Sequence, residues 1–302
     1  MKDIIYVESH YFVTVKNESL KFKNIIDKNE RFYLLDDIEA LVFDSPRSYY
    51  SQKLIVKCVE YNILVLFCDL KHSPIAEIIS DFAMVNRLQR IQDQLQVLSK
   101  TKDRLWKKIV ANKIINQAKC IENNVNKGST AKSLCEYARS VGPGDRTNRE
   151  SVAARLYFQS LYGKNFKRGR YDDKINSALN YGYSILRSFI KKELAIHGFE
   201  MSLGIKHHST ENPFNLADDI IECYRPFVDS MVYDLIFNCH ISSFGVTEKK
   251  KMLEVLYENC LIDKKIVKLV DSIKLTVQSL IKCYKQNTPT HLLLPKLIEV
   301  GN

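Results

Sequence analysis

Several features are scarce or missing in this 302-residue chain, and each absence excludes a class of protein. The chain has only 10 Gly and 7 Pro, which excludes collagen-like and linker-like sequences. Its longest uninterrupted apolar run, Ile63–Cys68, is too short to span a bilayer. Acidic residues stand near the start of the chain, where a signal peptide would be basic. We therefore expect a soluble, cytoplasmic protein with no membrane partner.

No C-x-x-C pair is present, which argues against a zinc ribbon or a thioredoxin-like motif. The cysteines are scattered along a chain that is long enough to build its own apolar core. We expect them to be reduced and mostly buried as small apolar side chains. They are Cys58, Cys68, Cys120, Cys135, Cys223, Cys239, Cys260 and Cys283.

Acidic residues are in the minority, because 45 Lys and Arg face 35 Asp and Glu and give a formal charge of +10. Residues 1–80 hold 10 basic and 12 acidic side chains, whereas the rest of the chain holds 35 and 23. This asymmetry predicts an acidic partner for the C-terminal part, with nucleic acid as the default. A solvated basic surface without such a partner is the alternative.

The first 70 residues are rich in β-branched and aromatic side chains and show the alternation typical of strands. Residues 48–61 have the apolar spacing of a helix instead. We predict a small β-rich domain that contains one helix. The expected strands are 4–7, 11–15, 20–22, 32–35, 38–43 and 63–67.

From about Ala76 the apolar period changes to 3.6, which predicts helices. The first apolar stripe consists of Ile78, Phe82, Val85, Leu88, Ile91, Leu95 and Leu98. Further helices are expected at 103–123, 129–140, 148–162, 172–196, 215–242, 247–260 and 263–285.

The predicted fold class is α+β, with a small N-terminal β-rich domain followed by a larger all-α C-terminal domain. We expect the β-rich domain over 1–75, a linker helix over 76–95 and the helical domain over 96–286. The tail, 287–302, contains two prolines and is expected to be irregular.

Thr147 and Glu150 open one of the expected helices and match the spacing of a capping box. In that interpretation Glu150 only turns back to its own helix N-terminus. The alternative is that Glu150, in the first turn beside a Gly-Pro-Gly loop, presents its carboxylate to a metal ion.

A second candidate pairs a loop with a following helix, for which Asn215 is a plausible N-cap. The loop holds His207 and His208, and the helix carries three acids, Asp218, Asp219 and Glu222, spaced three and four apart. Like charges at that spacing repel, and a divalent cation would remove the cost. Solvent-exposed acids at a helix N-terminus are the simpler interpretation.

A histidine with several carboxylates suits Mg²⁺, Mn²⁺ or Zn²⁺. Mostly oxygen ligands favour the harder ions, and one imidazole suits Mn²⁺.

Basic residues surround these segments, with aromatic side chains between them. The stretch Asn165–Arg170 resembles a loop that contacts phosphates, although solvated helix ends would give the same pattern. The candidate DNA-binding residues are Arg146, Arg149, Lys164, Lys167, Arg168, Arg170 and Lys206.

Taken together, these segments resemble the Cas1 family of CRISPR-associated integrases, which insert new spacers into CRISPR arrays. Asn148–Phe158 is similar to the family's first block, whose Glu binds metal, and Gly204–His207 is similar to its Gly-x-x-His block. Leu216–Asp229 is similar to the third block, most of all in members from type II systems. Its last acid, Glu222, is Asp in many members, so the charge is kept on a longer arm.

The resemblance implies that Glu150, His207 and Glu222 are the catalytic residues and the ligands of Mg²⁺ or Mn²⁺. Asp219 matches a second acid near the metal. His207 rather than His208 takes the ligand position because it follows Gly-x-x.

The resemblance also implies an assembly. Residues 1–75 would pair two chains as a homodimer, and the small protein Cas2 would bridge two dimers on double-stranded DNA from the spacer precursor and the leader–repeat. Each active site would join a spacer 3′-hydroxyl to the repeat by transesterification. Other adaptation proteins of a type II system are further candidate partners.

Two other functions fit the residues. One is a metal-dependent nuclease of DNA repair or RNA processing, which would use the same site chemistry. The other is a non-catalytic helical scaffold that binds DNA and requires no divalent metal.

Overall fold

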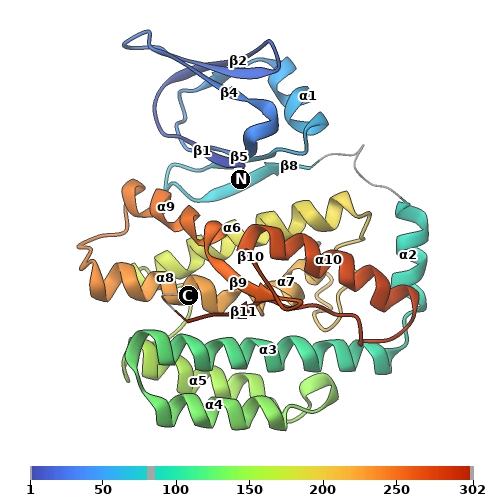
Figure 1. Cartoon of the computed structure of the whole chain (residues 1–302). Coiled ribbons are helices and arrows are strands. Elements are labelled where there is room, and N and C mark those ends of the chain that lie inside the picture. Colours follow the sequence, from blue (N-terminus) through green and yellow to red (C-terminus); the bar gives the residue numbers. More distant parts are fainter. Residues whose placement is uncertain (1, 80–85, 300–302) are drawn as a thin grey trace. The chain divides into compact units, whose positions relative to one another are not determined.

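The computed structural model describes residues 2–79 and 86–299. The chain folds as two compact units, residues 1–85 and 86–302 (Figure 1). Each unit has its own core, and each is described by itself below.

The N-terminal unit is built mainly from strands, as the sequence predicts. One sheet has the order β1-β5-β7-β8, and its first three strands run parallel. The second has the order β4-β3-β2-β6. The elements are β1 (Asp3–Val7), β2 (Tyr11–Lys16), β3 (Ser19–Asn24), β4 (Glu30–Leu34), η1 (Leu35–Asp37), β5 (Ile38–Phe43), β6 (Tyr49–Tyr50), α1 (Gln52–Glu60), β7 (Leu64–Cys68) and β8 (Pro74–Ile78).

The core of this unit lies between the inner faces of its sheets and the helix α1. Val13 of β2 pairs with Phe22 of β3, and both are buried, whereas Phe12, one residue before Val13, is half exposed. This alternation is the period of two that identified the strands in the sequence. Leu54 and Cys58 of α1 complete the same apolar cluster.

The second unit is mostly helical. Its helices are α2 (Arg87–Gln96), α3 (Ser99–Val125), α4 (Gly128–Ser140), η2 (Pro143–Asp145), α5 (Arg149–Tyr162), α6 (Lys174–Ile196), α7 (Asn215–Ile221), α8 (Arg225–Tyr233), the π-helical turn η3 (Asp234–Asn238), α9 (Val246–Met252), η4 (Leu253–Tyr257) and α10 (Leu269–Lys285). Its strands are β9 (Asn259–Ile262), β10 (Lys265–Lys268) and β11 (Lys296–Leu297).

The 27-residue helix α3 is the centre of this unit. It contacts α4 and α5 on one side and α7, α8 and β11 on the other (Figure 1). Because it is covered on two sides, polar residues such as Asn112, Lys113 and Asn116 are buried along with its apolar ones. Buried polar side chains need partners, and those of α3 anchor both the tail and the candidate site.

The expectation of an all-α second domain is wrong, because β9, β10 and β11 form an antiparallel sheet. The helix expected over 247–260 ends where the hairpin of β9 and β10 begins, and the helix expected over 263–285 begins only after that hairpin. Its turn is made by Asp263 and Lys264, both with positive φ angles of 49° and 63°. Two consecutive residues of that kind match the right-handed twist of a two-residue hairpin.

The expected linker helix over 76–95 is also wrong at its start. Residues Pro74–Ile78 form β8, which pairs antiparallel with β7, so the backbone of this segment satisfies its hydrogen bonds in a sheet. Phe82 and Val85 of the apolar stripe lie outside the described residues. Leu88 and Leu95, on α2, are mostly exposed.

The tail is more ordered than its prolines suggest. Strand β11 pairs with β9, and the side-chain amides of Asn112 and Asn116 donate hydrogen bonds to the carbonyl oxygen of Pro295. The backbone N–H of Leu297 donates to Asn116 Oδ1 in return. The expectation of an irregular tail over 287–302 therefore fails where the chain meets α3.

The single helix expected over 215–242 is broken into α7, α8 and a π-helical turn. Pro226 occupies the first turn of α8, where its missing N–H costs nothing. The break falls between Ile221 and Arg225, and Glu222 lies within it.

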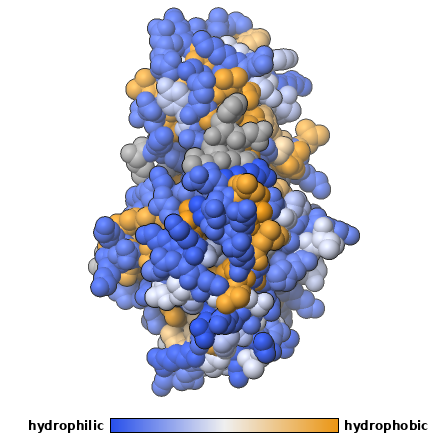
Figure 2. Space-filling model, turned by 90° about the vertical axis from the view of Figure 1, so that its right-hand side faces the viewer, coloured by the Kyte–Doolittle hydropathy of each residue, from blue (hydrophilic) through white to orange (hydrophobic). Residues whose placement is uncertain are grey.

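Surface and cysteine features agree with parts of the sequence analysis. The face drawn in Figure 2 is mostly hydrophilic, with apolar side chains gathered in a few groups. Within residues 2–79 and 86–299, no helix is long and apolar enough to cross a membrane. The eight cysteines are free thiols, and five of them are buried, as expected.

Candidate active site

Two of the predicted site residues meet at a buried lysine that the sequence analysis did not single out. Lys113 Nζ, on α3, lies 2.6 Å from Glu150 Oε1 and 2.5 Å from Glu222 Oε2. Only 10% of the Lys113 side chain and 8% of the Glu222 side chain are exposed. Two carboxylates from different elements therefore converge on one cation at the edge of the core.

Glu150 reaches this cluster because another acid caps its helix. The carboxylate of Asp145 accepts hydrogen bonds from the backbone N–H groups of Arg149 and Glu150, at 2.9 and 3.0 Å. Asp145 thus takes the role that a capping box gives to Thr147 and Glu150. The capping-box interpretation is wrong, and the Glu150 side chain is left to bind Lys113.

Glu222 sits between two cations. Arg225 Nη2 lies 3.0 Å from its Oε1, while Lys113 binds its Oε2. Burial alone would raise the pKa of Glu222, but Lys113 and Arg225 hold it below its usual value, so the carboxylate is ionised. Burial likewise opposes the charge on Lys113, and the two carboxylates outweigh it and raise the pKa of the ammonium.

His207 is held by an acid that is completely buried. Asp219 Oδ1 lies 2.8 Å from His207 Nδ1 and accepts the backbone N–H of the same residue at 3.1 Å. Its Oδ2 accepts the N–H groups of Ile205 and Lys206. One carboxylate thereby fixes the loop and the ring. Asp219, the predicted second acid, therefore occupies Nδ1 of His207, which leaves Nε2 for other partners.

The position of Gly204, three residues before His207, leaves no room for a side chain. A Cβ at Gly204 would clash with the carbonyl oxygen of His207 and would lie 2.9 Å from Asp219 Oδ2. The loop therefore folds tightly over the carboxylate only when this position has no side chain.

The two neighbouring histidines differ in their surroundings. The hydrogen bond that His207 makes to the Asp219 carboxylate raises the pKa of His207 against the opposing effect of burial. The indole of Trp106 contacts its ring edge to face at 5.9 Å. His208 instead lines a cavity of about 610 Å³ on the outer side of the loop.

The three acids expected on one helix face point to different partners. Asp218 binds Arg187 Nε at 2.6 Å, Asp219 binds the histidine loop, and Glu222 binds Lys113. The expected repulsion between them is therefore absent. Asn215 is the first residue of α7 rather than its N-cap, and its amide donates to the carbonyls of Ser202 and Ser209.

The side chains of the predicted ligands Glu150, His207 and Glu222 are of types that bind divalent metals, but they are not gathered around one point. Glu150 and Glu222 both bind the Lys113 ammonium, and the charge of His207 contributes to lowering the pKa of Glu222. Within the part of the chain that the structure describes, no three His, Cys, Asp or Glu side chains are close enough together to hold a metal ion.

Asp229, the last residue of the third motif block, is a further buried acid. Its oxygens accept hydrogen bonds from the hydroxyls of Tyr183 and Tyr157. Burial raises its pKa to about 6. The guanidinium of Arg225 stacks on the Tyr183 ring at 4.7 Å, so this cluster supports the residue that binds Glu222.

The predicted DNA-binding residues fall into three groups. Arg146, Lys164, Lys167 and Arg170 are exposed. Arg168 is turned inward, where it donates to Asn176 and Asn180 and stacks on Tyr183.

The remaining two predicted residues lie close to the candidate site. Lys206 Nζ donates to the Gly144 carbonyl and ties the histidine loop to the loop before α5. Arg149, at the start of α5, is partly buried.

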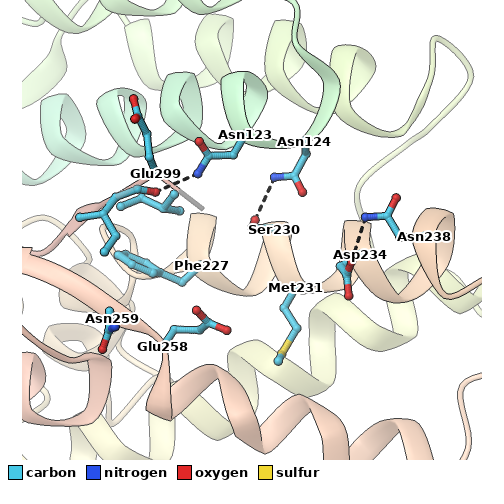
Figure 3. A pocket seen from close by; sticks show the side chains of 12 residues that line it. Asn123, Asn124, Phe227, Ser230, Met231, Asp234, Asn238, Glu258, Asn259 and Glu299 are labelled. Atoms are coloured by element: carbon cyan, nitrogen blue, oxygen red, sulfur yellow. Dashed lines mark hydrogen bonds between the residues drawn. The ribbon is translucent and has the colours of Figure 1, made fainter. Parts of the chain in front are cut away.

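A separate cavity of about 450 Å³ lies beside α3, α8 and β11 and holds none of the predicted site residues (Figure 3). Its amides are engaged within the protein, because Asn123 donates to the Ile298 carbonyl and Asn124 to Ser230. Its lining includes the acids Asp234, Glu258 and Glu299. Their charge disfavours DNA phosphates here.

Comparison with known protein families leads to the same family as the motif blocks. Residues 5–270 match the family model described as CRISPR associated protein Cas1. Because this match covers most of the sequence, the chain belongs to the Cas1 family.

Comparisons with individual proteins agree. The CRISPR-associated endonuclease Cas1 of Neisseria meningitidis serogroup C is 35% identical over 201 residues. That match spans 67% of this chain and 66%, just under two thirds, of the relative. A casposase solved bound to its integration product has a TM-score of 0.78 at 17% identity, covering 95% of this chain and 92% of that one.

A third similar protein is a chain of a Cas6-RT-Cas1–Cas2 complex, with a TM-score of 0.74 at 19% identity. The match covers 99% of this chain but 36% of that one. At these identities the two solved structures establish the shared fold.

Proposed function

We propose that this chain is a divalent-metal-dependent DNA integrase and endonuclease of CRISPR adaptation, most similar to members from type II systems. It would join the 3′-hydroxyls of spacer DNA to the CRISPR repeat by transesterification. The observation that supports this most is the convergence of Glu150 and Glu222 on one buried cation, beside a histidine oriented by Asp219. Cas1 family membership supports the same activity.

The proposed reaction exchanges one phosphodiester for another. The 3′-hydroxyl oxygen forms a bond to a repeat phosphorus, and the bond from that phosphorus to the repeat's own 3′ oxygen breaks. The attacking hydroxyl loses a proton and the departing strand end gains one. Bound Mg²⁺ or Mn²⁺ supplies positive charge that stabilises the phosphate and favours ionisation of the attacking hydroxyl.

The residues of this chain have separate tasks in that reaction. Glu150 and Glu222 hold the cation through carboxylate oxygens, and His207 would contribute Nε2. Asp219 keeps the imidazole oriented, because it binds Nδ1 and the backbone of the same loop. Arg225 keeps Glu222 ionised and in place.

Double-stranded DNA is the proposed partner of the exposed basic side chains. Arg146 is one of them, with 84% of its side chain exposed. Such residues position a DNA backbone through its phosphates without reading its sequence. Catalysis and DNA binding therefore rest on different residues.

The N-terminal unit is proposed to form a homodimer. The outer face of the sheet β4-β3-β2-β6 exposes four large apolar side chains, Phe12, Phe32, Leu34 and Tyr49. Phe12 and Tyr49 stack at 5.1 Å, so the patch is continuous across β2 and β6. Phe32→Ser should shift the chain from dimer to monomer in sedimentation experiments, whereas Leu70→Ser, at an 85% exposed turn position, should not.

Cas2 is the proposed bridge between dimers. The support is a solved complex whose printed name contains Cas1 and Cas2 and whose chain shares this fold. Other adaptation proteins of type II systems are proposed as further partners, because the third motif block is most similar to that of type II members.

The decisive experiment is strand transfer with purified protein on a leader–repeat duplex, with and without the Cas2 partner. Glu150→Ala and His207→Ala are expected to lose strand transfer and DNA cleavage while keeping the DNA affinity that is measured without divalent metal. Full strand transfer by the Glu150→Ala protein would refute the assignment. Cleavage of simple duplexes without transfer to half-site or branched substrates would indicate a nuclease of different biology instead.

A further inference from the structure

Lys113 occupies the space that the candidate site requires for its metal. Its ammonium lies 2.6 Å from Glu150 and 2.5 Å from Glu222, and these are the two carboxylates assigned to the metal. The three residues come from α3, from the start of α5 and from the break before α8. The only cation placed between these carboxylates in the described structure is thus one that the chain supplies itself.

The charges explain why a lysine is stable at this position. A buried ammonium is strongly disfavoured unless acids pair with it, and two buried acids repel each other unless a cation lies between them. Lys113 and Arg225 together balance Glu150 and Glu222. The cluster is therefore close to neutral before any metal enters.

A divalent ion would upset that balance. Together with Lys113 and Arg225 it would place four positive charges against the two carboxylates, within a few ångströms of one another. At that distance and in a partly desolvated site, the repulsion between the metal ion and the Lys113 ammonium is large. Both cations cannot use the same carboxylate oxygens at once.

We propose that Lys113 is an internal counter-ion which competes with the divalent metal and must withdraw from Glu150 and Glu222 when the metal binds. The proposal rests on the metal-binding role given to these acids under the proposed function. It makes Lys113 a positioning residue of the site: its ammonium holds the two carboxylates close together until a metal takes its place.

A consequence is that DNA and metal should assist each other. The displaced ammonium needs a new acceptor, and a DNA phosphate brought to the site is an anion within its reach. By linkage, DNA that accepts Lys113 would raise metal affinity, and metal would raise DNA affinity by the same factor.

Metal binding without DNA tests the competition directly. Mn²⁺ affinity would be measured from the electron paramagnetic resonance signal of free Mn²⁺, for the wild-type protein and for Lys113→Gln. We expect Lys113→Gln to bind Mn²⁺ at least about tenfold more tightly, because the competing charge is gone. The matched control is Lys119→Gln on the same helix, whose ammonium binds the exposed Glu122 and Glu299. It should leave the affinity unchanged.

A second measurement uses the wild-type protein, in case Lys113→Gln fails to fold. Acetylation of Lys113 by acetic anhydride, followed by mass spectrometry, reports whether its amine is held in the cluster. Saturating Mg²⁺ should speed this acetylation several-fold. Slower acetylation in Mg²⁺ would show that metal and lysine are held together, and would overturn the proposal.

The outcomes separate this inference from the proposed function. If wild-type protein binds Mn²⁺ in a manner abolished by Glu150→Gln, but folded Lys113→Gln binds no more tightly, only the role of Lys113 fails. If Glu150→Gln leaves Mn²⁺ binding unaffected, the metal site itself is wrong and the proposed function fails with it.

Discussion

Asp219 holds His207 at two points, through Nδ1 of the ring at 2.8 Å and through the backbone N–H at 3.1 Å. The carboxylate has no exposed surface and also accepts two further backbone N–H groups of the same loop. A single acid thus determines both the path of the loop and the orientation of the imidazole. This arrangement leads to the first prediction.

Asp219→Asn should reduce strand transfer strongly and lower stability. The amide NH₂ cannot accept the N–H groups that the lost oxygen accepted, and unsatisfied buried donors cost about 1–3 kcal/mol each. Chemical denaturation and strand-transfer assays measure the two effects. Asp218→Asn is the control, because Asp218 binds Arg187 at the partly exposed edge of the helix. Equal effects of the two substitutions would refute the special role of Asp219.

Gly204→Ala should displace the histidine loop. The added Cβ would clash with the His207 carbonyl and crowd Asp219 Oδ2, and overpacking of this kind costs about 1–3 kcal/mol. Gly128→Ala is the control, because nothing lies within 4 Å of a Cβ there. Thermal unfolding and strand transfer should both decline for Gly204→Ala only. Unchanged strand transfer by Gly204→Ala would show that the tight loop is not required.

The N-terminal strands were predictable because their signal is local. Alternation such as exposed Phe12 beside buried Val13 is visible without knowledge of any partner strand. The hairpin at Asp263 and Lys264 was missed because its turn has no Gly or Asn, the residues that usually mark two positive φ angles. Strand β8 was missed because Ile78 is the first residue of an apolar stripe with the helical period. In the structure its segment pairs with β7 instead of forming a helix.

The sequence indicated residues of the candidate site only where they lie inside the three motif blocks. Glu150, His207, Asp219 and Glu222 all lie within those blocks, and the structure gives each a defined partner. Lys113 was not predictable, because its partners are 37 and 109 residues away in the chain and nothing local marks it. Arg168 was not recognised as an inward-facing side chain because it stands among exposed basic residues, and its partners, Asn176 and Asn180, lie on the next helix.

The exposed basic residues should set the salt dependence of DNA binding. Lys167→Ala is expected to reduce the slope of log affinity against log salt concentration by about one, as for the loss of one phosphate contact. Its thermal stability should not change, because Lys167 is exposed. Fluorescence anisotropy between low and moderate salt measures the slope. A slope near zero for the wild-type protein would refute phosphate binding.

Arg168→Ala should behave differently from Lys167→Ala. Arg168 hydrogen-bonds Asn176 and Asn180 and stacks on Tyr183 at 5.1 Å, so its loss should lower the melting temperature. We expect a destabilisation of about 1–3 kcal/mol, because Asn180 Oδ1 loses its charged donor and the contact with the Tyr183 ring is lost. If Arg168→Ala instead kept its stability and lost one unit of salt slope, the side chain would be a DNA contact.

Asp229 should make the fold more stable as the pH falls from about 7 towards 4. Burial raises the pKa of the folded carboxyl from 3.8 to about 6, so in this range the folded protein binds a proton that the unfolded chain does not. The corresponding change is about 3 kcal/mol. The groups that face the carboxylate are Tyr157, Tyr162, Tyr183, Cys120, Arg168 and Arg225.

Asp229→Asn removes this titration and keeps the size of the side chain. Urea unfolding of both proteins between pH 4 and pH 7 should show a smaller gain in stability on acidification for Asp229→Asn. The tyrosines and Cys120 stay protonated throughout, because burial raises their pKa values, and the arginines stay charged. The difference between the two pH profiles therefore belongs to Asp229. Identical profiles would show that Asp229 is ionised in the folded protein over the whole range.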